Sequence, residues 1–332
     1  MNLQKNCGIG GQAVIEGIMM RNGGEYSVAC RKADGTVAMK KEPFRSVLPS
    51  EKAGKIPMVR GVVAFIDSLV VGISCLMYSA DVSSEEETDS EADTEKTEQQ
   101  KKKEKREWNL VMTGTVVFSI AFSVVLFMLL PFWIAGLLGR VGASTVLINV
   151  TEALLRVLIF LGYMLLISRM KDIQRVYAYH GAEHKCINCI EHGYDLTVEN
   201  VMKSSRQHRR CGTSFLLIVI CISVVAFLIL GIFDIRSRAM RLLWRLILIP
   251  VIAGISYEIL RYAGSHEGPV INALVKPGLM LQKLVTREPD EDMCAVAISA
   301  VEAVFDWRAW QEKNEQRADV LPSGAQSEEG AL

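Results

Sequence analysis

Two histidines and a glutamate fall within the short stretch "AYHGAEHKC", residues 178–186. His180 and His184 are four residues apart, so on one helix they share a face, and neutral imidazoles at this spacing can bind one metal ion. A bound metal lowers the pKa of its water to about 7, and Glu183 stands beside the pair to orient or deprotonate that water. The order His-x-x-Glu-His is that of the inverted zinc-peptidase motif. We therefore predict a divalent-metal site, with zinc as the expected ion and Glu183 as the catalytic residue.

The third ligand of this site is left open by the sequence. A catalytic zinc site has three protein ligands and one open position, and Glu258 in "ISYEILRYAG" could complete it from the end of an apolar segment. Alternatively, Glu258 forms an ion pair with Arg261 or another basic residue. A closed, purely structural site would instead draw on Cys189, His208, Cys211 and one of the two histidines of the motif. The simplest alternative is a solvated, charged helix that binds no metal.

Long apolar runs must position this chemistry. The chain has 332 residues, half of them apolar, and equal numbers of acidic and basic residues, which gives no argument for a nucleic-acid partner. Residues 108–139 and 211–233 contain no charge, and 141–168 and 242–262 contain few. Each run reaches the ~20 residues that cross a bilayer, and residues 1–30 lack the pattern of a signal peptide. We predict a mainly α, polytopic membrane protein with about four transmembrane helices, a small N-terminal β-containing segment and a cytoplasmic helical loop.

Basic residues near the spans predict the orientation. The loop 169–210 contains eight Lys and Arg residues, and "KKKEKRE" precedes the first span. Both are therefore expected in the cytoplasm of a bacterial cell, which places both termini there. The turn at 234–241 is an exception, because its three arginines, Arg236, Arg238 and Arg241, fall on the outer side. The expected partners are the lipid bilayer and a substrate in or on the membrane, and the oligomeric state is left open.

The remaining segments divide by composition. Residues 61–80 are apolar, but a span there would place the basic N-terminal region outside, so an interfacial or re-entrant helix is favoured over a fifth span. The predicted organisation is a Gly-punctuated soluble segment with a β-hairpin at 1–60, that helix at 61–80, a disordered charged linker at 81–107, transmembrane helices at 108–168 and 214–262, a His/Cys-rich loop at 169–213, interfacial and amphipathic helices at 263–310, and a disordered tail at 311–332.

Several of these blocks resemble an uncharacterised bacterial membrane family, domain of unknown function 1385, also called YqhQ-like. The resemblance rests on "GGQAVIEGIMMR", "RGVVAFIDSL", "YHGAEHKCINCIE", "LTVENV", "HRRCGTSF", "ISYEILRYAG" and "PGLMLQKLVTREPDEDMCAVAI". The resemblance implies a metal-dependent enzyme, and we expect this enzyme to be a hydrolase. The alternative is a non-catalytic membrane scaffold or transport component with a structural metal. Position 186 is more typically threonine in this pattern, so the resemblance favours Cys189 alone over a Cys186–Cys189 pair.

The first of these blocks contains a carboxylate in an apolar setting. Glu16 lies within "GGQAVIEGIMMR" and needs either a metal or a charged partner there. Arg21, five residues on, could supply that charge. Both residues are therefore further candidates for a site, and the simpler interpretation is a strand or loop that packs against the membrane core through a Glu16–Arg21 pair.

Overall fold

The computed structural model describes residues 6–48, 56–84, 98–233, 237–266 and 268–320. It is mainly helical, with one small antiparallel sheet near the N-terminus. The strands are β1 (Gly10–Val14), β2 (Gly17–Asn22), β3 (Glu25–Arg31) and β4 (Val37–Pro43), and they pair in chain order. The predicted β-containing segment is confirmed, and the expected hairpin corresponds to β3 and β4.

The first hairpin turns tightly. Val14 pairs with Gly17, so only Ile15 and Glu16 form the connection, and Glu16 has a positive φ of 49°. A Cβ at Gly17 would lie 2.2 Å from the carbonyl oxygen of Ala29. The close approach of β2 and β3 at this position therefore requires glycine.

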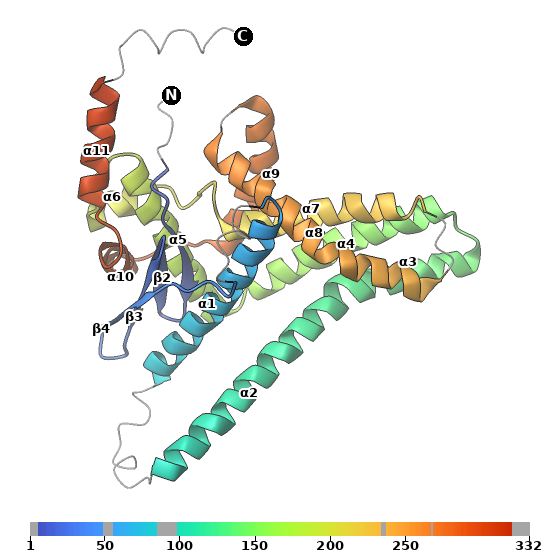
Figure 1. Ribbon diagram of the computed structural model, residues 1–332, viewed down its shortest axis with the longest axis horizontal. Helices are drawn as coiled ribbons and strands as arrows, with labels where there is room; N and C mark the ends of the chain where they lie inside the picture. Colours follow the sequence, from blue (N-terminus) through green and yellow to red (C-terminus); the bar gives the residue numbers. More distant parts are fainter. Residues whose placement is uncertain (1–5, 49–55, 85–97, 234–236, 267, 321–332) are drawn as a thin grey trace.

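One face of the sheet packs against helices from the centre and the end of the chain. Helix α5 (Lys171–Glu191) and α10 (Glu291–Glu302) lie on this face, with α6 (Val198–Lys203) and α11 (Trp307–Val320) beside them (Figure 1). Residues 178–191 of α5 are buried except His180. The solvation expected in one of the sequence alternatives for this segment is therefore wrong, because α5 is the central helix of the sheet-containing unit.

Helix α1 (Val59–Ser84) covers the opposite face of the sheet. Cys75 and Val82 are buried against Val14 and Val28. The hydroxyl of Ser79 accepts a hydrogen bond of 3.1 Å from the backbone of the β1–β2 turn. Other apolar side chains of α1 are exposed, Phe65, Ile66, Leu69 and Val70 among them. The helix therefore has one face on the sheet and another that is apolar and uncovered.

The longest helices extend away from the sheet (Figure 1). Helix α2 (Glu98–Val124) continues through a π-helical turn (Val125–Leu129) into α3 (Leu130–Leu137) and a 3-10 turn (Leu138–Val141). Helices α4 (Thr145–Ile167), α7 (Gly212–Leu230) and α8 (Arg238–Ser265) form the rest of the bundle, and α9 (Pro269–Val285) returns along α7. Among the described residues, five helices are long and apolar enough to cross a membrane, the four predicted segments and α1. Their length and composition suggest a membrane protein.

Two predicted disordered segments are partly helical. Residues 81–84 and 98–107, placed in the charged linker, belong to α1 and α2, and residues 311–320, placed in the tail, belong to α11. In α2 and α11 the polar residues extend a helix beyond its apolar residues, because each further residue adds one hydrogen bond to a helix that is already formed. The other parts of these predictions, 85–97 and 321–332, lie outside the described residues.

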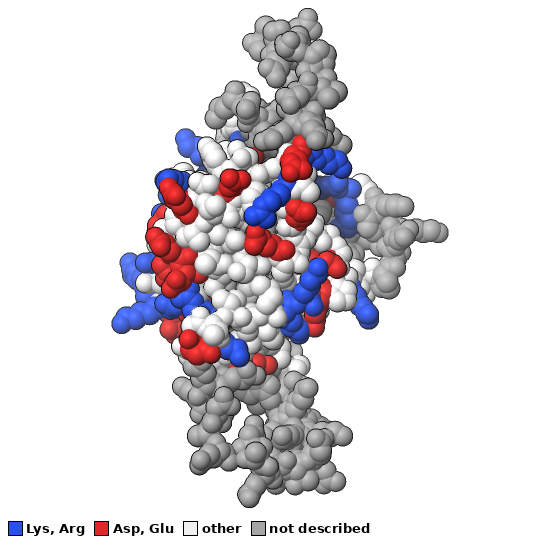
Figure 2. Space-filling view, turned by 90° about the vertical axis from the view of Figure 1, so that its left-hand side faces the viewer, with Lys and Arg blue, Asp and Glu red and all other residues white. Residues whose placement is uncertain are grey.

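The surface of the sheet-containing end differs from that of the bundle. Figure 2 views the molecule from this end, and acidic and basic side chains are interspersed over it. Large apolar side chains of the bundle are exposed instead, for example Trp133, Leu154 and Leu158. This division between a charged end and an apolar bundle is the one expected of a protein that is partly in water and partly in lipid.

Candidate metal centre

His180 and His184 on α5 both use Nδ1 to bond a backbone carbonyl, which leaves Nε2 of each ring free to bind a ligand. The Nδ1–H of His180 donates to the carbonyl of Val285 at 2.9 Å, and the Nδ1–H of His184 donates to the carbonyl of Arg206 at 2.7 Å. The rings are 4.4 Å apart between centroids. Backbone acceptors of this kind fix the tautomer of a histidine and its ring orientation. Each Nε2 is thereby left with its lone pair available to a ligand.

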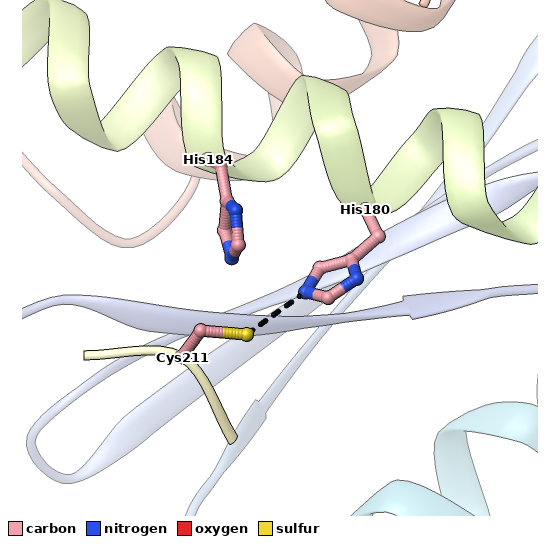
Figure 3. A group of neighbouring side chains, drawn as sticks. All are labelled: His180, His184 and Cys211. Atoms are coloured by element: carbon pink, nitrogen blue, oxygen red, sulfur yellow. Dashed lines mark hydrogen bonds between the residues drawn. The ribbon is translucent and has the colours of Figure 1, made fainter. Parts of the chain in front are cut away.

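A cysteine from the start of α7 faces these two nitrogens. Cys211 is the N-cap of α7, and its Sγ accepts a 3.4 Å hydrogen bond from the backbone of Thr213. The same sulfur lies 3.3 Å from Nε2 of His180. Figure 3 shows His180, His184 and Cys211 converging on one point from two elements. The structure thus brings together residues that are 31 positions apart in the chain.

The three donor atoms have the spacing of metal ligands. All lie within 4.8 Å of one another. Zinc bonds of about 2.0 Å to nitrogen and 2.3 Å to sulfur place two ligand atoms of a tetrahedral site roughly 3.5 Å apart. Imidazole and thiolate are also the ligand types that zinc prefers. Among the described residues this is the one group of three or more His, Cys, Asp or Glu with such spacing, and the donor set therefore fits the predicted ion.

The segment that leads to Cys211 is held by polar side chains of α5. Lys185 donates to the carbonyls of Met202 and Ser204 at 2.7 and 3.0 Å, and it also pairs with Glu288. Asn188 donates to two further carbonyls, those of residues 205 and 207. These bonds explain how charged and polar side chains can be buried on α5. They also hold the backbone carbonyl that orients His184.

Gln282 of α9 fixes the next part of the segment. Its Oε1 accepts from the backbone N–H of His208 at 2.9 Å, and its Nε2 donates to the His208 carbonyl and to Ser214 Oγ. The side chain is fully buried. Gln282 therefore sets the path of the chain on both sides of Cys211, and nothing in its local sequence distinguishes it from an ordinary polar residue of an amphipathic helix.

Glu183 lies beside the ligand group without belonging to it. Its carboxylate accepts from the backbone N–H of Gly11 in β1, and Oε2 has no hydrogen-bond partner among the described residues although it is buried. Burial raises the pKa of Glu183, against the nearby imidazole of His180 and the Gly11 N–H. Buried carboxylate oxygens are nearly always satisfied. An unsatisfied one next to a group of metal ligands marks a place where a further polar group can bind.

A second buried carboxylate, that of Glu191, holds the segment that leads to Cys211. Glu191, at the end of α5, accepts from His208 Nε2 at 3.2 Å, from Arg210 and from the backbone of Cys7. Burial would raise the pKa of Glu191, but these partners outweigh it and hold the pKa at about 2. Burial also lowers the pKa of His208. Near neutral pH a charged Glu191 thus accepts a hydrogen bond from the neutral imidazole of His208 and, through Arg210, anchors the segment one residue before Cys211.

The other predicted ligands lie outside the group. Glu258 forms an ion pair with Arg60 of α1, with one bond of 2.7 Å, and accepts from the backbone of Met58. Its alternative interpretation as an ion pair therefore fits the structure, with Arg60 rather than Arg261 as partner. Cys189 donates to the carbonyl of Asp195 at 3.4 Å. His208 has its Nε2 on Glu191, so the four-ligand closed site is not assembled.

The two N-terminal candidates have different partners from those expected. Glu16 pairs with Arg175 of α5 at 2.5 Å and is 3.4 Å from the hydroxyl of Tyr179. Arg21 lies over the ring of Phe44, 3.3 Å from its centroid. The expected Glu16–Arg21 pair is therefore wrong. Glu16, in the turn before β2, reaches α5, whereas Arg21, near the end of β2, contacts the residue that follows β4.

These features define a helical protein with five candidate membrane spans and a small α/β unit that holds a His/His/Cys group at one end of the bundle. The chain belongs to the DUF1385 family of proteins of unknown function, whose family model matches residues 56–307. It is 34% identical over 312 residues to the uncharacterized protein YqhQ of Bacillus subtilis (strain 168), covering 92% of this chain and 95% of that protein. No solved structure matches the chain.

Proposed function

We propose that the protein is a metal-dependent enzyme of the bacterial cell membrane that binds one divalent ion, with zinc expected, through His180, His184 and Cys211. One observation carries the proposal. Both histidines donate Nδ1–H to backbone carbonyls, which directs both Nε2 atoms toward the same sulfur. A catalytic zinc site has three protein ligands, whereas a closed structural site has four. The group here offers three ligands, and the described residues supply no fourth.

The placement of the chain in the membrane is part of this proposal. Helices α2–α3, α4, α7 and α8 cross the bilayer, and the sheet with α5, α6, α10 and α11 lies in the cytoplasm together with both termini. Helix α1 lies along the interface, because residues as far apart as Asp67 and Val82 contact the sheet segment. A helix that crossed the bilayer would have to carry those contacts into lipid. The candidate metal centre then faces a substrate at the membrane surface.

Glu183 is the proposed catalytic residue of a hydrolytic reaction. When bound, the metal supplies a Lewis acid that polarises the group under attack. Glu183 would accept a proton at Oε2, the atom that has no partner among the described residues, from the water that attacks the substrate, and would pass that proton to the leaving group as its bond to the substrate breaks. Its raised pKa brings the carboxylate closer to the working pH of a general base. The Gly11 N–H holds the other part of the carboxylate in place.

A non-catalytic scaffold with a structural metal is the second candidate. The observation in its favour is burial, because His184 is 1% and Cys211 5% exposed. A closed environment of this kind is typical of metal ions that stabilise a fold. In that case the metal would fix α5 to the start of α7, and Glu183 would have no part in chemistry.

The test compares Glu183→Gln with the matched exposed variant Glu199→Gln in a strain that depends on this protein for a measurable phenotype. We expect Glu183→Gln to retain bound metal and lose complementation, because the ligands remain while the proton acceptor is gone. Glu199→Gln should behave like wild type, since Glu199 pairs only with exposed Lys203. Full complementation by Glu183→Gln, with metal retained, would contradict the enzyme and favour the scaffold.

A further inference from the structure

A cluster of arginines inside the helix bundle has no part in the proposed metal chemistry. Glu152 of α4 accepts from Arg156 at 2.9 Å and from Arg245 of α8 at 2.6 and 2.8 Å. All three side chains are at most 6% exposed. Two guanidinium groups therefore share one carboxylate, and the cluster carries a net positive charge in an apolar setting. Such charges are costly in a membrane and mark functional sites.

The cluster is not fully satisfied. Arg245 is 2% exposed and uses both terminal nitrogens on Glu152, and its Nε has no partner among the described residues. The rings of Phe132 and Phe227 face its guanidinium, with centroids 4.6 and 5.1 Å away. Aromatic faces compensate only part of the charge of a buried cation. The cluster therefore keeps a net positive charge, which a nearby anion would offset.

A cavity of about 530 Å³ lies next to the cluster. Glu152 and Asn149 line both this cavity and a much smaller one, of about 10 Å³, which Arg156 and Arg245 also line. The rest of the larger wall is mainly apolar and comes from α3, α4 and α8, with Arg140 and Arg241 as its other charged residues. Its volume is in the range of small-molecule sites. The lining suits a ligand with an anionic head and an apolar body.

The position of the cavity agrees with such a ligand. It lies around α3 and the first turn of α8, at the end of the bundle opposite the sheet (Figure 1). Arg241, one of the arginines that depart from the rule for basic residues, lines the cavity at this end. Exposed apolar side chains flank the cavity, with Trp133 at 76% and Leu137 at 53% exposure. Lipid chains could follow this surface while the head enters the cavity.

We propose that this cavity binds the phosphate-bearing head of an anionic membrane lipid, with Arg140 at its mouth contacting the phosphate and Arg245 supplying positive potential from behind Glu152. Arginine pairs with phosphate through parallel N–H···O bonds. The lipid explains two features in which the metal chemistry has no part, the excess of arginine in the core and the two arginines, Arg140 and Arg241, that line the cavity.

The experiment measures lipid binding to the purified full chain in detergent by native mass spectrometry. Phosphatidylglycerol, phosphatidylcholine and inorganic phosphate are the three probes. Two variants address the cavity directly. Arg140→Gln removes an exposed charge at its mouth, and Gly136→Leu fills it, because a Cβ at Gly136 meets nothing within 4 Å. The matched controls are Arg169→Gln, at an exposed arginine of the opposite end, and Gly162→Leu, where a Cβ also meets nothing within 4 Å.

We expect wild type and both controls to bind phosphatidylglycerol at least tenfold more tightly than phosphatidylcholine. Arg140→Gln and Gly136→Leu should each weaken phosphatidylglycerol binding at least fivefold. Equal binding of the two lipids by wild type, or undiminished binding by Gly136→Leu, would overturn the proposal. Displacement of phosphatidylglycerol by millimolar inorganic phosphate would also overturn it, because the site would then recognise the free anion rather than a lipid.

Discussion

Gly181→Ala should destabilise the protein, although alanine is ordinarily the better residue inside a helix. Gly181 lies in the middle of α5, where an exposed position would gain about 1 kcal/mol from this change. Here a Cβ would lie 2.1 Å from the carbonyl oxygen of Arg287. That oxygen belongs to backbone held on α5, since the Arg287 N–H donates to the carbonyl of Tyr177 at 2.8 Å. The conflict therefore cannot be relieved by a side-chain rotation.

The size of the effect follows from the distances. Cβ contacts below 3.0 Å are essentially never seen, so the backbone around Arg287 must move by about 1 Å, an overpacking that costs roughly 1–3 kcal/mol. After the helix-propensity gain, we expect a net loss of about 1 kcal/mol in the free energy of unfolding. The same movement displaces Val285, whose carbonyl orients His180. Metal affinity should therefore fall although no ligand is changed.

The assay is unfolding of the purified protein in mixed detergent micelles, followed by tryptophan fluorescence, with metal affinity measured by competition against a chelator. Gly162→Ala is the control, because that glycine is also helical and a Cβ there meets nothing within 4 Å. It should be neutral or stabilising. The reasoning is refuted if Gly181→Ala is as stable as Gly162→Ala and binds metal like wild type.

Three further outcomes are expected. Glu191→Gln should lower the free energy of unfolding by about 3 kcal/mol near pH 7, which corresponds to the lowering of the Glu191 pKa from 4.5 to about 2. Because the folded pKa is depressed, this stability is present above pH 4.5 and is lost as the pH falls toward 2. Equal stability of variant and wild type at pH 7 would contradict the buried ion cluster. Glu258→Gln should weaken the contact with Arg60 by about 1 kcal/mol or less and leave metal content unchanged, which metal analysis checks. Accessibility mapping with an introduced cysteine at 193–195 should place the end of α5 in the cytoplasm, and labelling only from outside would reverse the proposed topology.

The sequence predicted those features that depend on local pattern. The four charge-free or nearly charge-free segments lie in helices that qualify as candidate spans. His180 and His184 share a helix face, as their spacing requires. The N-terminal segment, with its glycines and alternating residues, forms a sheet. In each case the information lies within about 20 neighbouring residues, where hydrophobic period and turn residues determine the structure.

The features that the sequence did not predict depend on contacts between distant elements. The polar residues of α5 left a solvated helix open as an alternative, but Lys185 and Asn188 are buried and satisfied by carbonyls of a segment that begins more than ten residues later. Glu258 looked like a third ligand because it lies near the end of a span, and only the packing of α1 on α8 shows Arg60 beside it. No local pattern indicates that Gln282 guides the chain to Cys211.

Metal analysis of the purified full chain tests the central claim most directly. The protein, prepared with divalent metals present and then freed of excess ions, should contain about one ion per chain. His184→Ala and Cys211→Ser should each lose it, because two ligands hold a divalent ion far less tightly than three, whereas Glu258→Gln should keep it. Wild-type protein without stoichiometric metal, or full metal content in both His184→Ala and Cys211→Ser, would contradict the assignment of this site.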